Sequence, residues 1–164
     1  MKPFPAESLH PIYLYLSEEQ WEEKLQKSRK LASPCVLCGR RCQAPRFILS
    51  ENSGTATRPT KGICETQDKA SVSSVGPHFG EEPPLVGKRG SGTIFFTGCN
   101  LKCVFCQNYD IAHHHRGQEV SDEELGQLML RVQELGCHNV NLVSPTHVVP
   151  NIIAAVRLAA RQGF

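Results

Sequence analysis

Cysteine is the residue type in this sequence that most strongly suggests chemistry, because the chain of 164 residues contains eight cysteines. Seven of them fall into two groups: Cys35, Cys38, Cys42 and Cys64 form the first, and Cys99, Cys103 and Cys106 form the second. The first residues, from Met1 to Pro5, lack the apolar core of a secretory signal. Clustered cysteines in such a chain hold metal or carry out redox chemistry more often than they form disulfides. The sequence therefore predicts a metal centre.

The second group has the spacing C-x3-C-x2-C between Cys99 and Cys106. Three thiolates on so short a loop can bind one face of an iron–sulfur cube. A [4Fe–4S] cluster has four irons and normally takes four cysteines, so three thiolates leave one iron open. The loop follows the apolar run Thr93–Thr97, which predicts a buried strand, and βα folds place their chemistry at the carboxyl ends of strands. The motif thus indicates an open, catalytic cluster rather than a closed structural metal knuckle.

The first group, from Cys35 to Cys64, supplies four thiolates with spacings x2, x3 and x21. Four thiolates can close a tetrahedral zinc site or bind a second iron–sulfur cluster. Arg40 and Arg41 would offset the negative charge of such a site. A zinc ribbon usually shows two C-x2-C pairs, and this group contains only one. The pattern therefore does not identify the metal, and four unligated thiols are the alternative. A site with four ligands would be structural or would relay electrons.

Several other residues invite a functional interpretation. Consecutive side chains of an extended segment point in alternating directions, so His113–His115 predict a solvated loop rather than one metal site. His147 follows the second predicted strand and is expected to contact a ligand or to cap the next helix. His78 with Glu81–Glu82 either lines the mouth of the site or forms an exposed turn. Cys137 is expected to be a small buried apolar residue.

The pattern of apolar residues predicts the elements that position these side chains. They are a helix over 17–31, a short strand over 71–75 in a small cap, a strand over 93–97, a helix from Ser121, a strand over 139–143 and a helix that carries Ile152 and Val156. Ser17 with Gln20, and Ser121 with Glu124, form capping boxes at two helix starts. The last four elements alternate strand and helix, which is typical of parallel βα units.

The predicted fold class is therefore α/β. We expect the first two βα units of a partial parallel (βα) barrel, preceded by a loop-rich, Cys-containing N-terminal module. The expected divisions are 1–34 for an N-terminal arm and helix, 35–90 for the Cys-rich loop module and 91–164 for the start of the barrel. Two βα units cannot close a barrel, so we also expect the chain to be a fragment that cleaves its cofactor poorly on its own.

The segment 98–108, GCNLKCVFCQN, resembles the signature loop of the radical S-adenosylmethionine (radical SAM) superfamily. Phe105, before the last cysteine, and Asn108, two residues after it, are similar to the branch of the pyruvate formate-lyase activating enzymes. The flanking segments 78–84, 90–96 and 141–147 are similar to an uncharacterised subgroup of that branch. The resemblance covers residues 35–164.

The resemblance implies that Cys99, Cys103 and Cys106 bind a [4Fe–4S] cluster whose open iron is chelated by S-adenosylmethionine. One electron then cleaves the sulfonium C–S bond, and the resulting 5′-deoxyadenosyl radical abstracts hydrogen from a substrate. The residues expected to contact S-adenosylmethionine are Phe105, Asn108, Ser144, Thr146 and His147. The superfamily often has Gly-Gly-Glu after the second strand; here Ser144-Pro145-Thr146-His147 stands there, so a hydroxyl of Ser144 or Thr146 would take part of that role. No catalytic residue is assigned.

The remaining predictions concern context. A net charge of +2 is too small for a nucleic-acid surface built on bulk charge, and no apolar stretch is long enough to span a membrane. We expect a cytoplasmic oxidoreductase, with an electron donor of the flavodoxin or ferredoxin type and, by analogy with the branch, a protein substrate that carries a glycyl radical. The alternatives are an iron–sulfur electron-transfer protein and a zinc-binding structural module. The three-cysteine loop argues against an electron carrier.

Overall fold

The computed structural model describes residues 11–47 and 59–164, so residues 1–10 of the expected N-terminal arm lie outside the described residues. The elements are η1 (Ile12–Tyr15), α1 (Glu18–Leu31), β1 (Ala70–His78), α2 (Pro83–Val86), β2 (Ser91–Phe96), α3 (Tyr109–His113), β3 (Gln118–Val120), α4 (Asp122–Glu134), β4 (Val140–Val143), η3 (Thr146–Val148) and α5 (Val149–Ala160). In these described parts no helix is long and apolar enough to cross a membrane.

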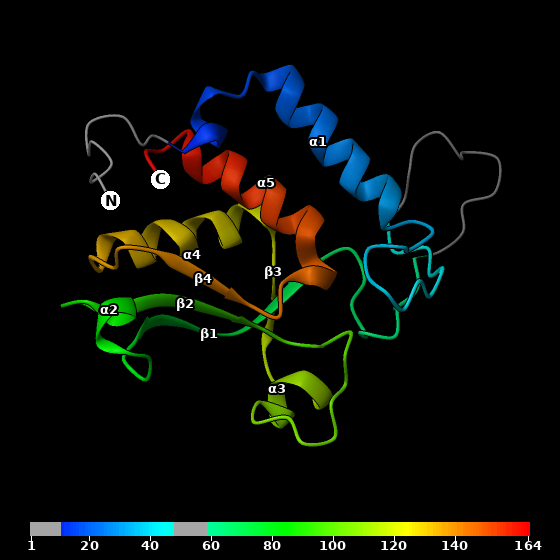
Figure 1. Cartoon of the computed structure of the whole chain (residues 1–164). Helices are drawn as coiled ribbons and strands as arrows, with labels where there is room; N and C mark the ends of the chain where they lie inside the picture. Colours follow the sequence, from blue (N-terminus) through cyan, green and yellow to red (C-terminus); the bar gives the residue numbers. More distant parts are fainter. Residues whose placement is uncertain (1–10, 48–58) are drawn as a thin grey trace, which may run out of the picture.

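The centre of the fold is a four-stranded sheet with the order β3-β1-β2-β4 (Figure 1). β2 and β4 are parallel and adjacent, with Ile94 opposite Leu142, as the strand–helix–strand pattern predicts. The sheet also contains antiparallel neighbours, because β1 pairs antiparallel with both β2 and β3. The sheet is therefore mixed, and the chain has an α/β fold.

The strand expected in a separate cap, over 71–75, belongs to this main sheet. It lies within β1, which pairs with β2 through partners such as Val75 and Ile94. Val72 explains the placement, because its side chain is buried in the same core as that of Phe96. The expected division near residue 90 thus falls in the connection between β1 and β2. Antiparallel neighbours such as these can be joined directly, without a crossover.

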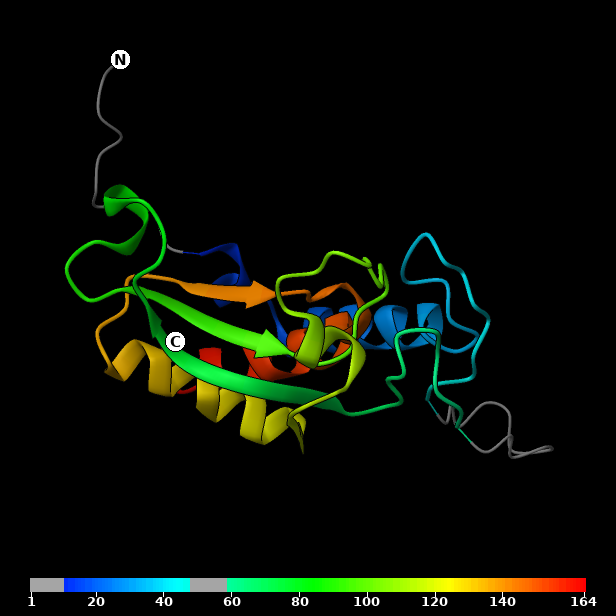
Figure 2. The same cartoon turned by 90° about the horizontal axis from the view of Figure 1, so that it is seen from below.

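Helices cover one face of the sheet. α4 and α5 pack together on it, and α1 lies alongside α5 (Figure 1). The buried side chains between the layers include Ile94 and Phe96 from β2 and Leu125 and Met129 from α4. In the part of the chain that the structure describes, the opposite face is crossed only by the segment around α3, at one end of the sheet (Figure 2).

Local sequence signals explain where the helices begin. Ser17 accepts the Gln20 amide N–H at 3.3 Å, and the Gln20 side chain accepts the Ser17 N–H at 2.8 Å. Ser121 and Glu124 form the same reciprocal pair at the start of α4. Both predicted capping boxes are confirmed, and each satisfies amide groups that a helix start leaves without partners.

Candidate functional site

The Cys99 loop begins at the carboxyl end of β2, beside the carboxyl end of its parallel neighbour β4. The turn into it requires glycine at position 98, which has φ +75°. A Cβ there would lie 2.5 Å from the Cys64 carbonyl oxygen, a distance that real Cβ atoms do not reach. The Gly98 amide donates to the Ile111 carbonyl at 2.9 Å, which ties the two ends of the loop together. The loop is thus anchored at its base.

The three cysteines of this loop differ in their surroundings. Cys99 is buried, and its sulfur accepts the Leu101 N–H at 3.4 Å, whereas Cys103 and Cys106 are half-buried. Between the latter two, Val104 is 86% and Phe105 is 89% exposed. The donor set fits an iron–sulfur cluster, because three thiols lie on one short loop and two of them can reach a group outside it. Over the described residues, no three side chains already surround one point as metal ligands, so the thiols must turn to bind one.

The four cysteines of the first group come together directly behind this loop. Cys35, Cys38, Cys42 and Cys64 all line one small cavity, together with Arg46, His147 and Asn100 among others. Burial raises the pKa of the Cys42 thiol, but hydrogen bonds from the Ala44 and Ile63 amides and from the Cys35 thiol outweigh it, so its pKa lies below the ordinary value. All eight cysteines of the chain lie in the described residues, and all are free.

Two basic side chains tie the first group to the Cys99 loop. Arg40 donates from Nε to the Asn100 carbonyl and from Nη2 to the Leu101 carbonyl, both at 2.9 Å. Lys102, within the loop, pairs with Glu65 at 3.0 Å. The Lys102 hydrogen bond lowers the pKa of the Glu65 carboxyl, against a smaller opposing effect of burial. Sequence reasoning assigned Arg40 only to charge balance and missed this contact, which joins residues about sixty positions apart.

His147 lies inside the protein, only 1% exposed, and joins the ends of β4 and β2. Its Nε2 is 2.9 Å from the Thr97 carbonyl, so Nε2 carries the proton and Nδ1 is an acceptor. Burial lowers the pKa of His147 to about 4, although the bond to Thr97 opposes this, so the ring is neutral at pH 7. Nδ1 of His147 and the hydroxyl of Thr97 are both buried without a hydrogen-bond partner. Such atoms need an explanation, and a bound polar ligand is one.

The other residues expected to contact S-adenosylmethionine lie near this end of the sheet. Ser144, with φ +57°, and Thr146 are exposed just after β4, and Asn108 is half-buried at the start of α3. The exposed hydroxyls and the exposed Phe105 ring remain available to a ligand, whereas His147 is buried and lines the cavity of the first cysteine group. The structure thus brings these residues to the carboxyl ends of the two parallel strands without testing their roles.

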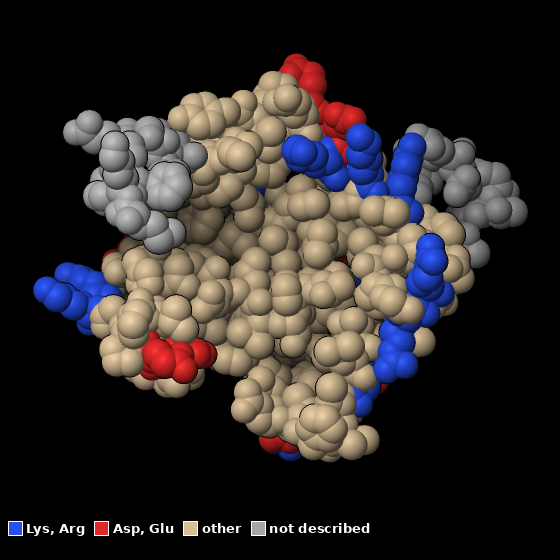
Figure 3. Space-filling model, viewed as in Figure 1, with Lys and Arg blue, Asp and Glu red and all other residues tan. Residues whose placement is uncertain are grey.

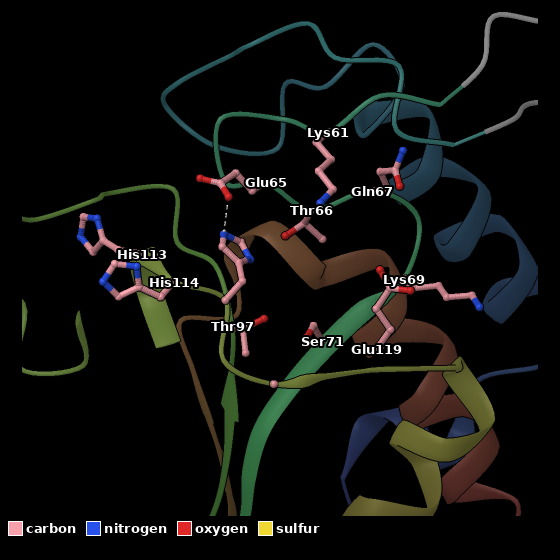
Figure 4. A pocket seen from close by; sticks show the side chains of 12 residues that line it. Lys61, Glu65, Thr66, Gln67, Lys69, Ser71, Thr97, His113, His114 and Glu119 are labelled. Carbon is pink, nitrogen blue, oxygen red and sulfur yellow. Dashed lines mark ion pairs between the residues drawn. The ribbon is translucent and has the colours of Figure 1, made fainter. Parts of the chain in front are cut away.

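A polar pocket of about 320 Å³ lies beside the loop, between the segment around Glu65 and the start of β1 (Figure 4). Glu65 meets His115 there at 3.0 Å. Burial lowers the pKa of His115, and the Glu65 charge opposes this. Lys61 and Lys69 bring positive charge to the lining, and Glu65 and Glu119 bring negative charge. The balance favours a polar ligand over a strongly charged one. Sequence reasoning missed this pocket, because its walls come from distant segments.

The three consecutive histidines do not form a common site. His113 donates from Nε2 to the Cys103 carbonyl at 3.1 Å, and His115 pairs with Glu65. His113 and His114 lie to one side of the other lining residues (Figure 4). Their divergence agrees with the prediction that they do not converge on one ion, although His113 supports the loop rather than being merely solvated.

Of the two alternatives for His78 with Glu81–Glu82, the structure favours the exposed turn, because both glutamates are exposed. His78 pairs opposite Ser91 at the amino end of β2, so it lies at the end of the sheet opposite to the Cys99 loop and cannot line its mouth. It is 3.9 Å from Glu81. Cys137 is half-buried, and its thiol lies 3.7 Å from the Arg89 carbonyl, so it is not a buried apolar residue.

The surface charge is unevenly distributed. On the face seen in Figure 3, Lys and Arg side chains gather on the side of the Cys35–Cys64 segment and of the end of α1, while the middle of the face carries almost no charge. The basic side chains therefore collect where thiolates would bring negative charge.

Comparison with known protein families finds a match for the part of the chain that contains the loop. Residues 93–163 match the family model described as the radical SAM superfamily, and this segment runs from β2 through the Cys99 loop to the end of α5. This segment of the chain is thus similar to radical SAM domains.

The chain is also similar to an uncharacterised protein of Methanocaldococcus jannaschii. The two are 34% identical over 98 residues, which is 60% of this chain and 25% of the archaeal protein. The chain thus spans about a quarter of the length of this relative. No solved structure matches the chain.

Proposed function

We propose that this chain holds a [4Fe–4S] cluster at Cys99, Cys103 and Cys106 and reductively cleaves S-adenosylmethionine to start radical chemistry. The observation that carries the proposal is the position of the loop. Its three cysteines follow β2 directly, at the carboxyl ends of two parallel strands, within the segment that matches the radical SAM superfamily. Parallel βα folds place their reactive groups at this end.

When bound, the cluster and S-adenosylmethionine supply a one-electron cleavage that yields methionine and a hydrogen-abstracting 5′-deoxyadenosyl radical. The protein's part is to hold and orient these groups. The three thiolates would bind three irons and would leave the fourth open, because the loop contains no fourth cysteine. Gly98 and Arg40 fix the loop against the rest of the protein.

The residues around the loop suit the binding of S-adenosylmethionine. The exposed Phe105 ring offers an apolar surface to a base, and the hydroxyls of Ser144 and Thr146 are free to bond an amino or carboxylate group. His147 is neutral, so its unpaired Nδ1 accepts a hydrogen bond but adds no charge. Together these groups would position a zwitterionic ligand without burying an unpaired charge.

The proposal extends to the subfamily and its context. Phe105 and Asn108 support the branch of the activating enzymes, and thus a protein substrate with a glycyl radical. We further propose that more strands complete the β2–β4 pair into a partial barrel. A flavodoxin or ferredoxin would supply the electron. Eight free cysteines support a reducing, cytoplasmic setting.

Anaerobic reconstitution with iron and sulfide tests this function. We expect about four irons per chain at the loop, as a cubane requires. Changing Cys99, Cys103 and Cys106 together to Ala should remove them, whereas Cys137→Ala, which alters a half-buried cysteine outside both groups, should not. The reduced wild-type protein should also release 5′-deoxyadenosine from S-adenosylmethionine, and the triple variant should release none.

Two outcomes would overturn the proposal. One is an unchanged iron and sulfide content in the triple variant, which would place the cluster elsewhere. The other is a wild-type protein that holds colourless metal at the loop instead of iron and sulfide, which would favour a zinc-binding module.

A further inference from the structure

The cavity behind the Cys99 loop gathers thiols from two separate stretches of chain. A Cβ at Gly62 would lie 3.3 Å from the sulfur of Cys42 and 3.4 Å from that of Cys64, so both sulfurs face the same glycine. The Cys35 thiol forms a hydrogen bond with the Cys42 thiol, and Cys38 lines the same cavity. Four sulfur donors thus share one small space, although they do not yet surround a single point.

A buried cation without a carboxylate partner lies in the wall of this cavity. Arg46 is 0% exposed, and its Nε and Nη2 donate to the Gln67 carbonyl at 3.1 and 2.8 Å. No carboxylate of the described residues pairs with it, and its Nη1 is 3.9 Å from the Cys35 sulfur. A buried charge left uncompensated is strongly destabilising. Arg46 is therefore placed where it would face the negative charge of thiolates bound to a metal ion.

The size of the cavity distinguishes between a metal ion and a cluster. Its free volume of about 10 Å³ equals roughly one water-sized sphere. A single ion with metal–sulfur bonds of about 2.3 Å needs little more than this, whereas a four-iron cube would have to displace the surrounding side chains. Four thiolates around one ion select a tetrahedral metal, for which zinc is the common choice.

We propose that Cys35, Cys38, Cys42 and Cys64 bind one zinc ion, and that this ion fixes the Cys99 loop in place. A zinc ion with four thiolates carries two net negative charges, and the guanidinium groups of Arg46 and Arg40 at the same cavity match them. This site is independent of the cluster, so it goes beyond the function proposed above.

The link to the loop runs through the backbone between the ligands. Arg40 lies between two of the cysteines and donates to the carbonyls of Asn100 and Leu101. The carbonyl of Cys64 lies against Gly98, at the base of the loop. A metal that fixes the Cys38–Cys42 turn and Cys64 therefore fixes both contacts with the loop.

Metal analysis of the full chain tests the proposal. Protein purified without air should contain one zinc per chain, and cobalt in its place should give the visible bands of tetrahedral thiolate coordination. The Cys99, Cys103 and Cys106 triple Ala variant should keep the zinc and lose the iron. Cys38→Ser with Cys42→Ser should lose the zinc, and Cys137→Ser, the matched control, should keep it. Arg46→Met should weaken zinc binding by about 10- to 100-fold, as loss of a supporting residue around a metal does.

Cobalt titration of the triple variant decides the matter even if the Cys38 and Cys42 variant does not fold, because the triple variant retains all four proposed ligands. One equivalent of tetrahedral thiolate-bound cobalt supports the site. Absence of zinc together with absence of cobalt bands would overturn it, and so would reconstitution of the triple variant with about four irons, since a second cubane would then occupy the cysteines. Neither result changes the iron count expected at the Cys99 loop of the wild-type protein.

Discussion

The two cysteine groups are neighbours in the fold, yet they differ in how far their surroundings are exposed to solvent. The group from Cys35 to Cys64 lines an enclosed cavity with a fully buried arginine, and two of its four cysteines are buried. The group from Cys99 to Cys106 lies on a loop whose middle residues, Val104 and Phe105, are almost fully exposed. Within one small fold, cysteines are thus placed in one enclosed and one open environment.

The difference shows how similar spacing motifs acquire different chemistry. An enclosed set of four thiols has no position left for a reactant, which suits a structural ion. An open set of three leaves an iron and an exposed surface for a cofactor. Gly98 and Arg40 connect the two regions, so the enclosed region can hold the open one in position. The predictions below change this connection or one of the two regions.

Gly98→Ala should have the largest effect, because it disrupts the contact between the two regions. The added Cβ would lie 2.5 Å from the Cys64 carbonyl and 2.8 Å from the His115 ring, at a φ that alanine disfavours. We expect a loss of about 3–5 kcal/mol in the free energy of unfolding from overpacking and backbone strain together. Urea denaturation measures it.

Two glycines serve as controls for this change. Gly39→Ala meets no atom within 4 Å and should be nearly neutral, and Gly163→Ala, with φ +92° but no contact, should cost only the backbone strain. A Gly98→Ala protein as stable as Gly39→Ala would show that the loop does not pack against the Cys64 segment.

Acid should destabilise the protein through His147. Because burial holds its pKa at about 4, below the ordinary value near 6.5, the unfolded chain binds a proton between these two pH values while the folded protein does not. Stability is therefore full above about pH 6.5, falls as the pH drops towards 4, and changes no further below it, a loss of about 3 kcal/mol. His147→Gln should remove this part of the pH dependence, measured by denaturation of both proteins freed of metal.

The Gln side chain retains an N–H that can donate to the Thr97 carbonyl, so it keeps the link between β2 and β4. If the wild-type protein and His147→Gln lost stability equally between pH 7 and pH 4, the ring would not be buried in its neutral form.

Arg40→Met should have a smaller effect on stability. It removes both hydrogen bonds to the loop carbonyls, but the side chain is exposed, so we expect a loss of about 1 kcal/mol. The loop should then release its iron faster to a chelator. Arg41→Met is the matched control, and equal rates of iron release from the two variants would contradict a clamping role for Arg40.

Phe105→Ala should barely change stability, by less than about 0.5 kcal/mol, because the ring is exposed. It should nevertheless weaken binding of S-adenosylmethionine to the reconstituted protein. Val104→Ala, beside it and equally exposed, should change neither property. A stability loss of several kcal/mol on Phe105→Ala would instead give the ring a structural role.

The features that the sequence predicts best depend on neighbouring residues. The capping boxes at Ser17 and Ser121 place the starts of two helices, because each bond joins residues three positions apart. The parallel pairing of Ile94 with Leu142 follows from the alternation of strand and helix, which allows few topologies.

The features that the sequence does not reveal depend on distant contacts. β1 joins the main sheet because Val72 packs in its core. The alternation of apolar residues along β1 does not indicate that its partner is β2. The contact of Arg40 with the Cys99 loop and the burial of Arg46 require knowledge of how the chain returns on itself. The cysteine spacing identified the donors, but the enclosed and open surroundings emerge only in three dimensions.

Electron paramagnetic resonance of the reduced, reconstituted chain tests the central claim most directly, because it reports whether the loop holds a cluster with an open iron. We predict the signal of a reduced [4Fe–4S] cluster that changes when S-adenosylmethionine is added, that is absent after Cys103→Ala, and that persists after Cys137→Ala. A signal that does not change when S-adenosylmethionine is added, or that is unchanged in the Cys103→Ala variant, would contradict the assignment of an open cluster to the Cys99 loop.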